Sequence, residues 1–185
     1  MKKRKYDSRK DTLDHIDAVR TYLEQIRNAL HGRANAHDKS KLKEPEKSFF
    51  DKHTPLLATL TYGSDEYNQA LSELQPALKH HYQANAHHPE HYAQIECNLC
   101  FQKLPISHDG RCPGCMNDSF VEINGVNVDG MNLLDIVEMF ADWKAATERY
   151  NDGDLRKSLE INAKRFKLSP QLYSVLKNTI DELGW

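Results

Sequence analysis

The chain has 185 residues, 25 of them Lys or Arg and 27 Asp or Glu. The formal net charge of -2 excludes the strong positive field that non-specific nucleic-acid binding needs, and no apolar run is long enough to cross a membrane. At roughly 150 residues per domain, this length predicts one compact domain with room for a small insert. The basic N-terminus leads into no apolar signal segment, so we expect a soluble, cytoplasmic protein.

The N-terminal third predicts two helices. Apolar residues recur at steps of three and four over residues 8–30, which is typical of an amphipathic helix that faces a core. His15 lies on the flank of that apolar stripe, pointing inward or nearly so. A second, short helix is predicted over residues 34–42, and it would contain His37 and Asp38.

A third helix is predicted after the turn at Tyr62-Gly63, with Ser64 as its N-terminal cap. Its apolar stripe ends in His81, whereas His80 lies about 100° away from that stripe. His81 is therefore the better candidate for an inward role. His87-His88 precedes a proline and is predicted to lie at a bend.

Residues 94–129 lose the helical periodicity and predict an insert with its own architecture. Within it, residues 120–128 predict a hairpin that turns at Asn124-Gly125. Helical order returns at Asn132, and two more helices follow, the last one capped by Ser169. The predicted organisation is thus a helical domain of residues 1–93 plus 130–185 with an insert of residues 94–129.

The insert carries four cysteines in two C-x-x-C pairs, at positions Cys97, Cys100, Cys112 and Cys115. Thiols of a chain without an export signal are expected to stay reduced, so the pairs favour metal over disulfides. Two such pairs can present four thiolates to one zinc ion, and the segment resembles a zinc ribbon. We expect a structural zinc ion that stabilises a segment too small for a core, with an iron-sulfur cluster or a single iron as the alternative. No basic cluster lies between the second cysteine pair and Asp135, which disfavours nucleic-acid binding by the ribbon, and a protein partner is left open.

Histidines and aspartates also recur on or beside the apolar stripes of separate predicted helices. Burying that many titratable groups without a compensating ion would cost several kcal/mol, and a shared metal centre removes the cost. Imidazole and carboxylate ligands suit divalent Mn, Fe, Co, Ni, Mg or Zn. The candidates are His15, His37, Asp38, His81, His87 or His88, and Asp135 or Asp142.

These residues resemble a known group. His37-Asp38-Lys39-Ser40-Lys41 is similar to the HD-x-[GS]-K signature of the HD-domain metal-dependent phosphohydrolase superfamily. The wider pattern, which covers nearly all of the chain except the cysteine insert, resembles a small HD-like family of unknown function encoded by phages and bacteria. It includes Asp11-Thr12-Leu13, Thr61-Tyr62-Gly63-Ser64, His80-His81-Tyr82, His87-His88-Pro89-Glu90-His91 and Asp142-Trp143-Lys144-Ala145-Ala146. The resemblance implies an all-α, HD-like helical bundle around the zinc-ribbon insert.

The resemblance also implies roles for single residues. It assigns His15, His37, Asp38 and Asp142 to a first metal ion, and His81 and His88 to a second. Asp135 stays in reserve, because its place three residues after Asn132 also suits a role at the helix N-terminus. The doubled histidines at 80/81 and 87/88 leave the second site open, and one metal ion rather than two is an alternative.

The leading function is hydrolysis of a nucleotide or a related phosphate ester, with Asp38 and Lys41 in catalytic roles. Lys41 would neutralise charge on the phosphate, and Lys144 and Arg149 are candidate phosphate-binding residues. The alternatives are a non-enzymatic interaction module stabilised by zinc, and an HD-type oxygenase with two iron ions.

Overall fold

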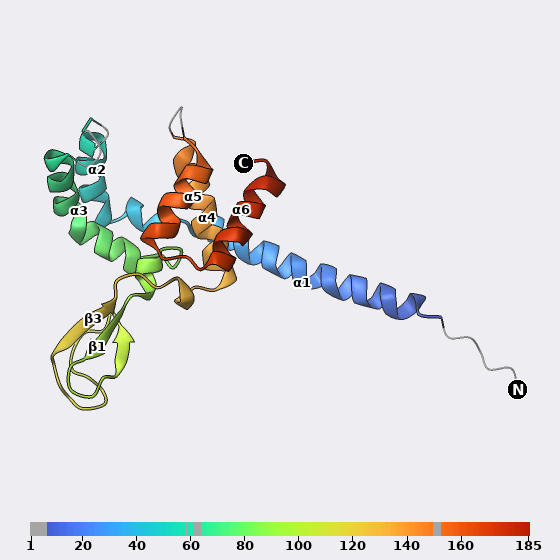
Figure 1. The fold of residues 1–185 in the computed structure, drawn as a ribbon, viewed down its shortest axis with the longest axis horizontal. Coiled ribbons are helices and arrows are strands. Elements are labelled where there is room, and N and C mark those ends of the chain that lie inside the picture. Colours follow the sequence, from blue (N-terminus) through green and yellow to red (C-terminus); the bar gives the residue numbers. More distant parts are fainter. Residues whose placement is uncertain (1–6, 58, 61–63, 150–152) are drawn as a thin grey trace, which may run out of the picture. The chain divides into compact units, whose positions relative to one another are not determined.

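The computed structural model describes residues 7–57, 59–60, 64–149 and 153–185. The chain divides into two compact units, Met1–His37 and Asp38–Trp185. Both ends of the predicted insert, residues 94 and 129, fall within the second unit. In the described residues the protein is mostly helical, with one small antiparallel sheet, in agreement with the predicted fold class (Figure 1).

In the described residues, the first unit contains one long helix, α1 (Arg9–Ala36). Its apolar side chains follow the predicted spacing, but α1 buries none of them, and Ile16, Leu23 and Ile26 are all exposed. The predicted core for this helix is therefore absent from its own unit. The helix also runs six residues beyond the predicted end at Leu30, through Gly32.

The predicted helix over residues 34–42 is wrong. Residues 34–36 belong to α1, and the chain leaves the helical path at His37, which is extended (φ −47°, ψ 127°). Asp38 follows in the left-handed region (φ 55°), a conformation that aspartate tolerates better than most residues. A short 3₁₀ helix, η1 (Lys39–Leu42), comes next. His37 and Asp38 thus lie between two helices rather than inside one.

Several helices of the second unit begin at capping residues, and the sequence predicts two of these caps, Ser64 and Ser169. In α3, α4 and α6 the backbone N–H groups of the first turn donate to the side chains of Ser64, Asn132 and Ser169, respectively. The predicted turn at Tyr62-Gly63 lies outside the described residues. The elements are α2 (Glu46–Leu57), α3 (Asp65–Ala84), η2 (Pro89–Tyr92), η3 (Val128–Gly130), α4 (Leu133–Thr147), α5 (Leu155–Arg165) and α6 (Pro170–Leu183).

The helices of the second unit pack in two groups. α2 packs against α3, and α4 and α6 both pack against α5. The main core lies among α4, α5 and α6, where apolar side chains meet at helical spacing. Its buried members are Met131, Met139, Phe140, Trp143, Leu155, Leu159, Phe166, Leu176 and Ile180.

The sheet has the strand order β2-β1-β3 and is antiparallel throughout. Its strands are β1 (Gln94–Cys97), β2 (Lys103–Pro105) and β3 (Phe120–Asn124). The predicted hairpin about Asn124-Gly125 is wrong, because β3 pairs with β1 and residues 128–130 form η3 instead. The Asn98 N–H donates to the Ser119 carbonyl beside this pair. None of the described helices is both long and apolar enough to cross a membrane.

Candidate metal centres

The four cysteine sulfurs of the insert lie within 4.8 Å of one another. Their two C-x-x-C segments share one backbone pattern. In each, the first cysteine's N–H donates to the carbonyl five residues on (Gln102, Asn117), and its carbonyl accepts from the N–H four residues on (Phe101, Met116). Both Phe101 and Met116 are left-handed, with φ of 59° and 62°. Two equivalent turns therefore present two thiols each, the arrangement that a tetrahedral thiolate site requires.

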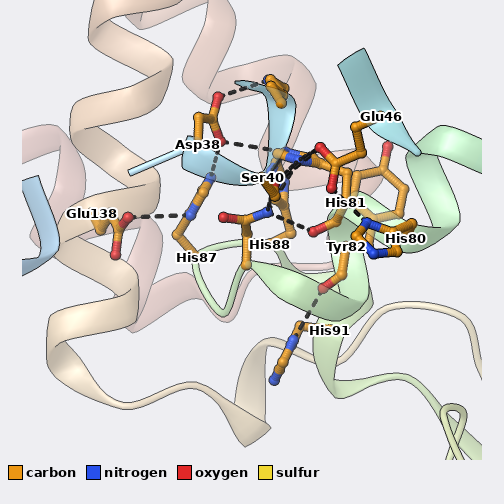
Figure 2. A network of polar contacts seen from close by, with 12 residues as sticks. Asp38, Ser40, Glu46, His80, His81, Tyr82, His87, His88, His91 and Glu138 are labelled. Atoms are coloured by element: carbon orange, nitrogen blue, oxygen red, sulfur yellow. Dashed lines mark hydrogen bonds and ion pairs between the residues drawn. The ribbon is translucent and has the colours of Figure 1, made fainter. Parts of the chain in front are cut away.

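The second group, which we call the Asp38 cluster, consists of Asp38, His81, His87 and His88. Each of these residues offers one ligand atom, and the four atoms lie within 4.8 Å of one another. They come from different parts of the second unit: the start of η1, the end of α3 and the bend before η2. The predicted bend at His87-His88 thus turns both rings toward Asp38 (Figure 2).

Asp38 lies at the centre of this cluster. Its Oδ1 is 3.4 Å from His81 Nε2 and 3.5 Å from His87 Nε2. His88 Nε2 is 2.9 Å from His81 Nε2. The other oxygen, Oδ2, accepts a hydrogen bond of 2.7 Å from Lys41 Nζ, and that ammonium also lies 5.2 Å from the centre of the Phe50 ring. Lys41 therefore orients Asp38, with Oδ1 turned toward the histidines.

His81 and His87 are almost fully buried, at 1% and 2% exposure. The sequence prediction that His81 points inward and that His80 does not is confirmed, since the His80 side chain is 46% exposed. Burial lowers the pKa of His81, helped by the charge of Lys41 and opposed by Asp38 and Glu46. Burial and then the neighbouring His87 and His81 lower the pKa of His88 to about 3. Neutral imidazole is the form that binds a metal ion.

Carboxylates surround the cluster on its outer side. Glu46, which is fully buried, accepts from His80 Nδ1 at 2.7 Å and from His81 Nδ1 at 2.9 Å. Burial alone would raise the pKa of Glu46, but the hydrogen bonds of His80, Ser40 and His81 outweigh it and hold the pKa below its ordinary value. Glu138 of α4 lies with Oε1 3.3 Å from His87 Nδ1.

The structure thus brings together Asp38, Lys41, His81 and His88 of the predicted site residues, and it also includes His87, which is the alternative to His88 in the sequence prediction. His37 is the last residue of the first unit and precedes Asp38 in the chain. Asp142 lies on α4, near enough for its charge to raise the pKa of His88 against the effect of burial. Lys144 pairs with Glu148 at 2.9 Å, and Arg149 lies just after α4 and is exposed.

Two of the candidate ligands predicted from the sequence have other places in the structure. Asp135 is fully buried, but its Oδ2 accepts from the Asn132 N–H at 2.9 Å and from the Tyr92 hydroxyl at 2.7 Å. It closes the capping box of α4, as the alternative interpretation predicts. His15 lies 22 positions before His37 in the sequence, and the continuous helix α1 holds the two about 33 Å apart. One ion cannot bind both residues of the same chain.

Glu46 and Glu138 are site residues that the sequence did not reveal. Glu46 is the first residue of α2, where an acidic side chain is ordinary, so its position gives no signal. Glu138 precedes Asp142 by four residues and thus shares a helix face with a candidate ligand. That spacing is a signal from which Glu138 can be identified.

The fold and these two groups define a mostly helical protein with a thiol cluster in its small sheet and an imidazole-carboxylate cluster between its helices. The model of a family of unknown function, DUF5662, matches residues 4–182, and the chain belongs to this family. The comparisons with curated proteins and with solved structures gave no significant match.

Proposed function

We propose that this protein is a metal-dependent phosphohydrolase, related to the HD-domain superfamily, that acts on a nucleotide or a related phosphate ester. The observation that supports the proposal most is the convergence of Asp38 Oδ1 with two buried histidines. It agrees with the resemblance of residues 37–41 to the HD signature. All four residues of the Asp38 cluster belong to the second unit.

The chemistry of the donor set fits a divalent transition metal. One carboxylate and three imidazoles favour Fe, Mn, Co, Ni or Zn over Mg, which prefers oxygen ligands. In the proposal Asp38, His81, His87 and His88 hold the ion. His37, as the neighbour of Asp38 in the chain, and Asp142 are proposed as further ligands of this or a second ion. When bound, such an ion lowers the pKa of a bound water and polarises a phosphoryl oxygen.

The residues around the cluster prepare the site for this chemistry. Lys41 holds Asp38 Oδ2 and thereby directs Oδ1 toward the histidines. Its ammonium charge lies at the edge of the cluster, where it can also neutralise charge on a phosphate. Lys144 and Arg149 are proposed to bind further phosphate oxygens, which in the case of Lys144 requires exchange of its contact with Glu148.

For the cysteine group we propose a structural zinc ion. Four thiols fill all positions of a tetrahedral site and leave none for a substrate. The Asn117 side-chain amide donates to Cys97 Sγ at 3.4 Å, a contact that stabilises a thiolate. The ribbon is also the proposed contact for a protein partner. Reduced thiols at such a site agree with a cytoplasmic location.

The first experiment is element-resolved metal analysis of protein purified without chelator. We expect one zinc ion per chain at the cysteines and a second metal that H37A/D38A loses. Two iron ions in place of that second metal, together with oxygen consumption, would favour the two-iron oxygenase. A single zinc ion in both proteins would contradict the enzyme proposal and favour the interaction module.

The second experiment is a hydrolysis panel of nucleotides and other phosphate esters with the metal that the first experiment identifies. We expect D38A to fall to the uncatalysed rate, because it removes the central carboxylate. D51A is the matched control, since Asp51 also pairs with a lysine, Lys47, but on the exposed face of α2. Equal rates for D38A and the parent would contradict the proposal.

A further inference from the structure

The two buried histidines of the Asp38 cluster share one arrangement. Each points Nε2 at Asp38 Oδ1 and Nδ1 at a glutamate from a helix that carries neither histidine. For His81 the glutamate at Nδ1 is Glu46 (Oε2 at 2.9 Å), and for His87 it is Glu138 (Oε1 at 3.3 Å). Ser40 Oγ and the Asn85 amide nitrogen also lie 3.3 Å and 3.0 Å from His81 Nδ1, but the amide donates to the Ser40 hydroxyl and to the His81 carbonyl. Figure 2 shows His87 with Asp38 on one side and Glu138 on the other.

An ionised carboxylate only accepts hydrogen bonds, so a glutamate at Nδ1 requires that nitrogen to carry the ring proton. The neutral ring then has its lone pair on Nε2, the nitrogen that faces Asp38. Nothing at Asp38 itself would impose this tautomer, because a carboxylate there could equally accept from Nε2–H. The glutamates therefore decide which nitrogen of each ring is available to a metal ion.

Glu46 is itself fixed in place. It is fully buried, and both of its oxygens have partners: Oε1 accepts from His80 Nδ1 at 2.7 Å, and Oε2 accepts from the Ser40 hydroxyl at 2.9 Å as well as from His81. The carboxylate cannot rotate without loss of these contacts. This gives the doubled histidine a physical meaning, since His81 faces the cluster while His80 secures the glutamate behind it.

We propose that Glu46 and Glu138 are positioning residues, which fix the tautomer and the ring orientation of His81 and His87 and thereby set the metal affinity of the Asp38 cluster. The inference rests on the proposed function only in that the cluster binds a metal ion. It assigns a role to two helices, α2 and α4, that supply none of the four atoms of the cluster. Loss of such a carboxylate typically weakens metal binding by about 10 to 100 fold.

The test is a Co²⁺ titration of the full chain with zinc already bound at the cysteines. Visible absorption reports cobalt in a nitrogen and oxygen site and separates it from cobalt bound to thiolate. We expect E46Q and E138Q each to raise the dissociation constant for Co²⁺ by about 10 to 100 fold. H80A should raise it by a smaller factor, because it removes one of the contacts that hold Glu46.

E73Q is the matched control. Glu73 also faces a buried histidine, with 3.8 Å between its Oε2 and His53 Nε2, but it lies outside the cluster. We expect E73Q to bind Co²⁺ like the parent. Circular dichroism and the thermal midpoint of the cobalt-free variants separate positioning from folding, because a merely structural glutamate would lower the midpoint and leave the affinity unchanged.

The outcomes separate the two proposals. A parent protein that binds Co²⁺ only at the cysteines, or not at all, would overturn both. If the parent binds Co²⁺ at the cluster and both E138Q and E46Q bind it with the same affinity, the positioning role is overturned and the proposed function stays intact. Because Glu138 and Glu46 lie on different helices, E138Q decides the question if E46Q does not fold.

Discussion

At the scale of single residues, His88 has the largest consequence for the response to pH. Its ordinary pKa of 6.5 is lowered to about 3, by burial first and then by His87 and His81. The folded protein therefore takes up this proton only near pH 3, whereas the unfolded chain takes it up near pH 6.5. Stability from this group is complete above pH 6.5 and is lost as the pH falls from 6.5 toward 3.

The first prediction follows from that sign. When the pH is lowered from 7.5 to 5.5, we expect the titration of His88 to lower the free energy of unfolding by about 1 kcal/mol. Asparagine cannot take up the proton, so the free energy of unfolding of H88N should fall less over this pH range, by that same amount. Urea unfolding at the two pH values, with the Asp38 cluster free of metal, measures the difference. H31N, at an exposed position of α1, serves as the control, and an H88N that loses as much stability as the parent would contradict the expected sign.

The sequence predicts the histidines of the Asp38 cluster better than the glutamates that contact them. Histidine in an apolar stripe identifies His81, because the helical period fixes which face of α3 is buried. The choice between His87 and His88 could not be made from the sequence, since at a bend no period applies, and the structure uses both. Glu46 has no signal at all: its role depends on α2 packing against α3, a tertiary contact that no local pattern encodes.

At the scale of elements, α4 separates a structural carboxylate from a proposed ligand. Asp135 closes the N-terminal capping box and accepts from the Tyr92 hydroxyl. Asp142 lies seven residues further along and acts electrostatically on His88. The sequence left the two open, because both are aspartates on the polar side of one predicted helix. The difference arises from the first turn of α4, where unpaired N–H groups need an acceptor.

The second prediction uses that difference. We expect D135N to lower the unfolding free energy by about 1 to 2 kcal/mol, through the weakened cap and the buried hydrogen bond of Tyr92. Its affinity for Co²⁺ should match that of the parent. D142N should show the reverse, with weaker Co²⁺ binding and little loss of stability. Urea unfolding and the Co²⁺ titration check both variants. If D135N bound Co²⁺ more weakly than D142N, the assignment of Asp135 as the structural carboxylate and Asp142 as the ligand would be contradicted.

At the scale of the whole molecule, the sequence predicted most of the helices, but it predicted neither α2 nor the division of the chain. The period of three and four correctly identified a helix from Ser8, yet a period cannot say what covers the apolar face. Gly32 lies two residues beyond the predicted end at Leu30, and glycine in a helix interior costs about 1 kcal/mol relative to alanine. Nevertheless α1 continues through Gly32 to Ala36, so residues 9–36 form one uninterrupted helix.

The last prediction concerns His15. The continuous helix α1 holds His15 about 33 Å from His37, whereas two ligands of one ion lie within about 5 Å of each other, given bonds of roughly 2.0 to 2.3 Å. This separation is a property of α1 alone, so it holds wherever the helix lies relative to the second unit. We expect H15A to bind Co²⁺ within about twofold of the parent, as H31A should on the same helix, while H37A binds more weakly. If H15A instead weakened binding as much as H37A, His15 would have to reach the cluster from a second copy of the chain. Sedimentation of the cobalt-bound protein would then show a dimer that H15A dissociates, and a monomer would mean that α1 is broken in solution.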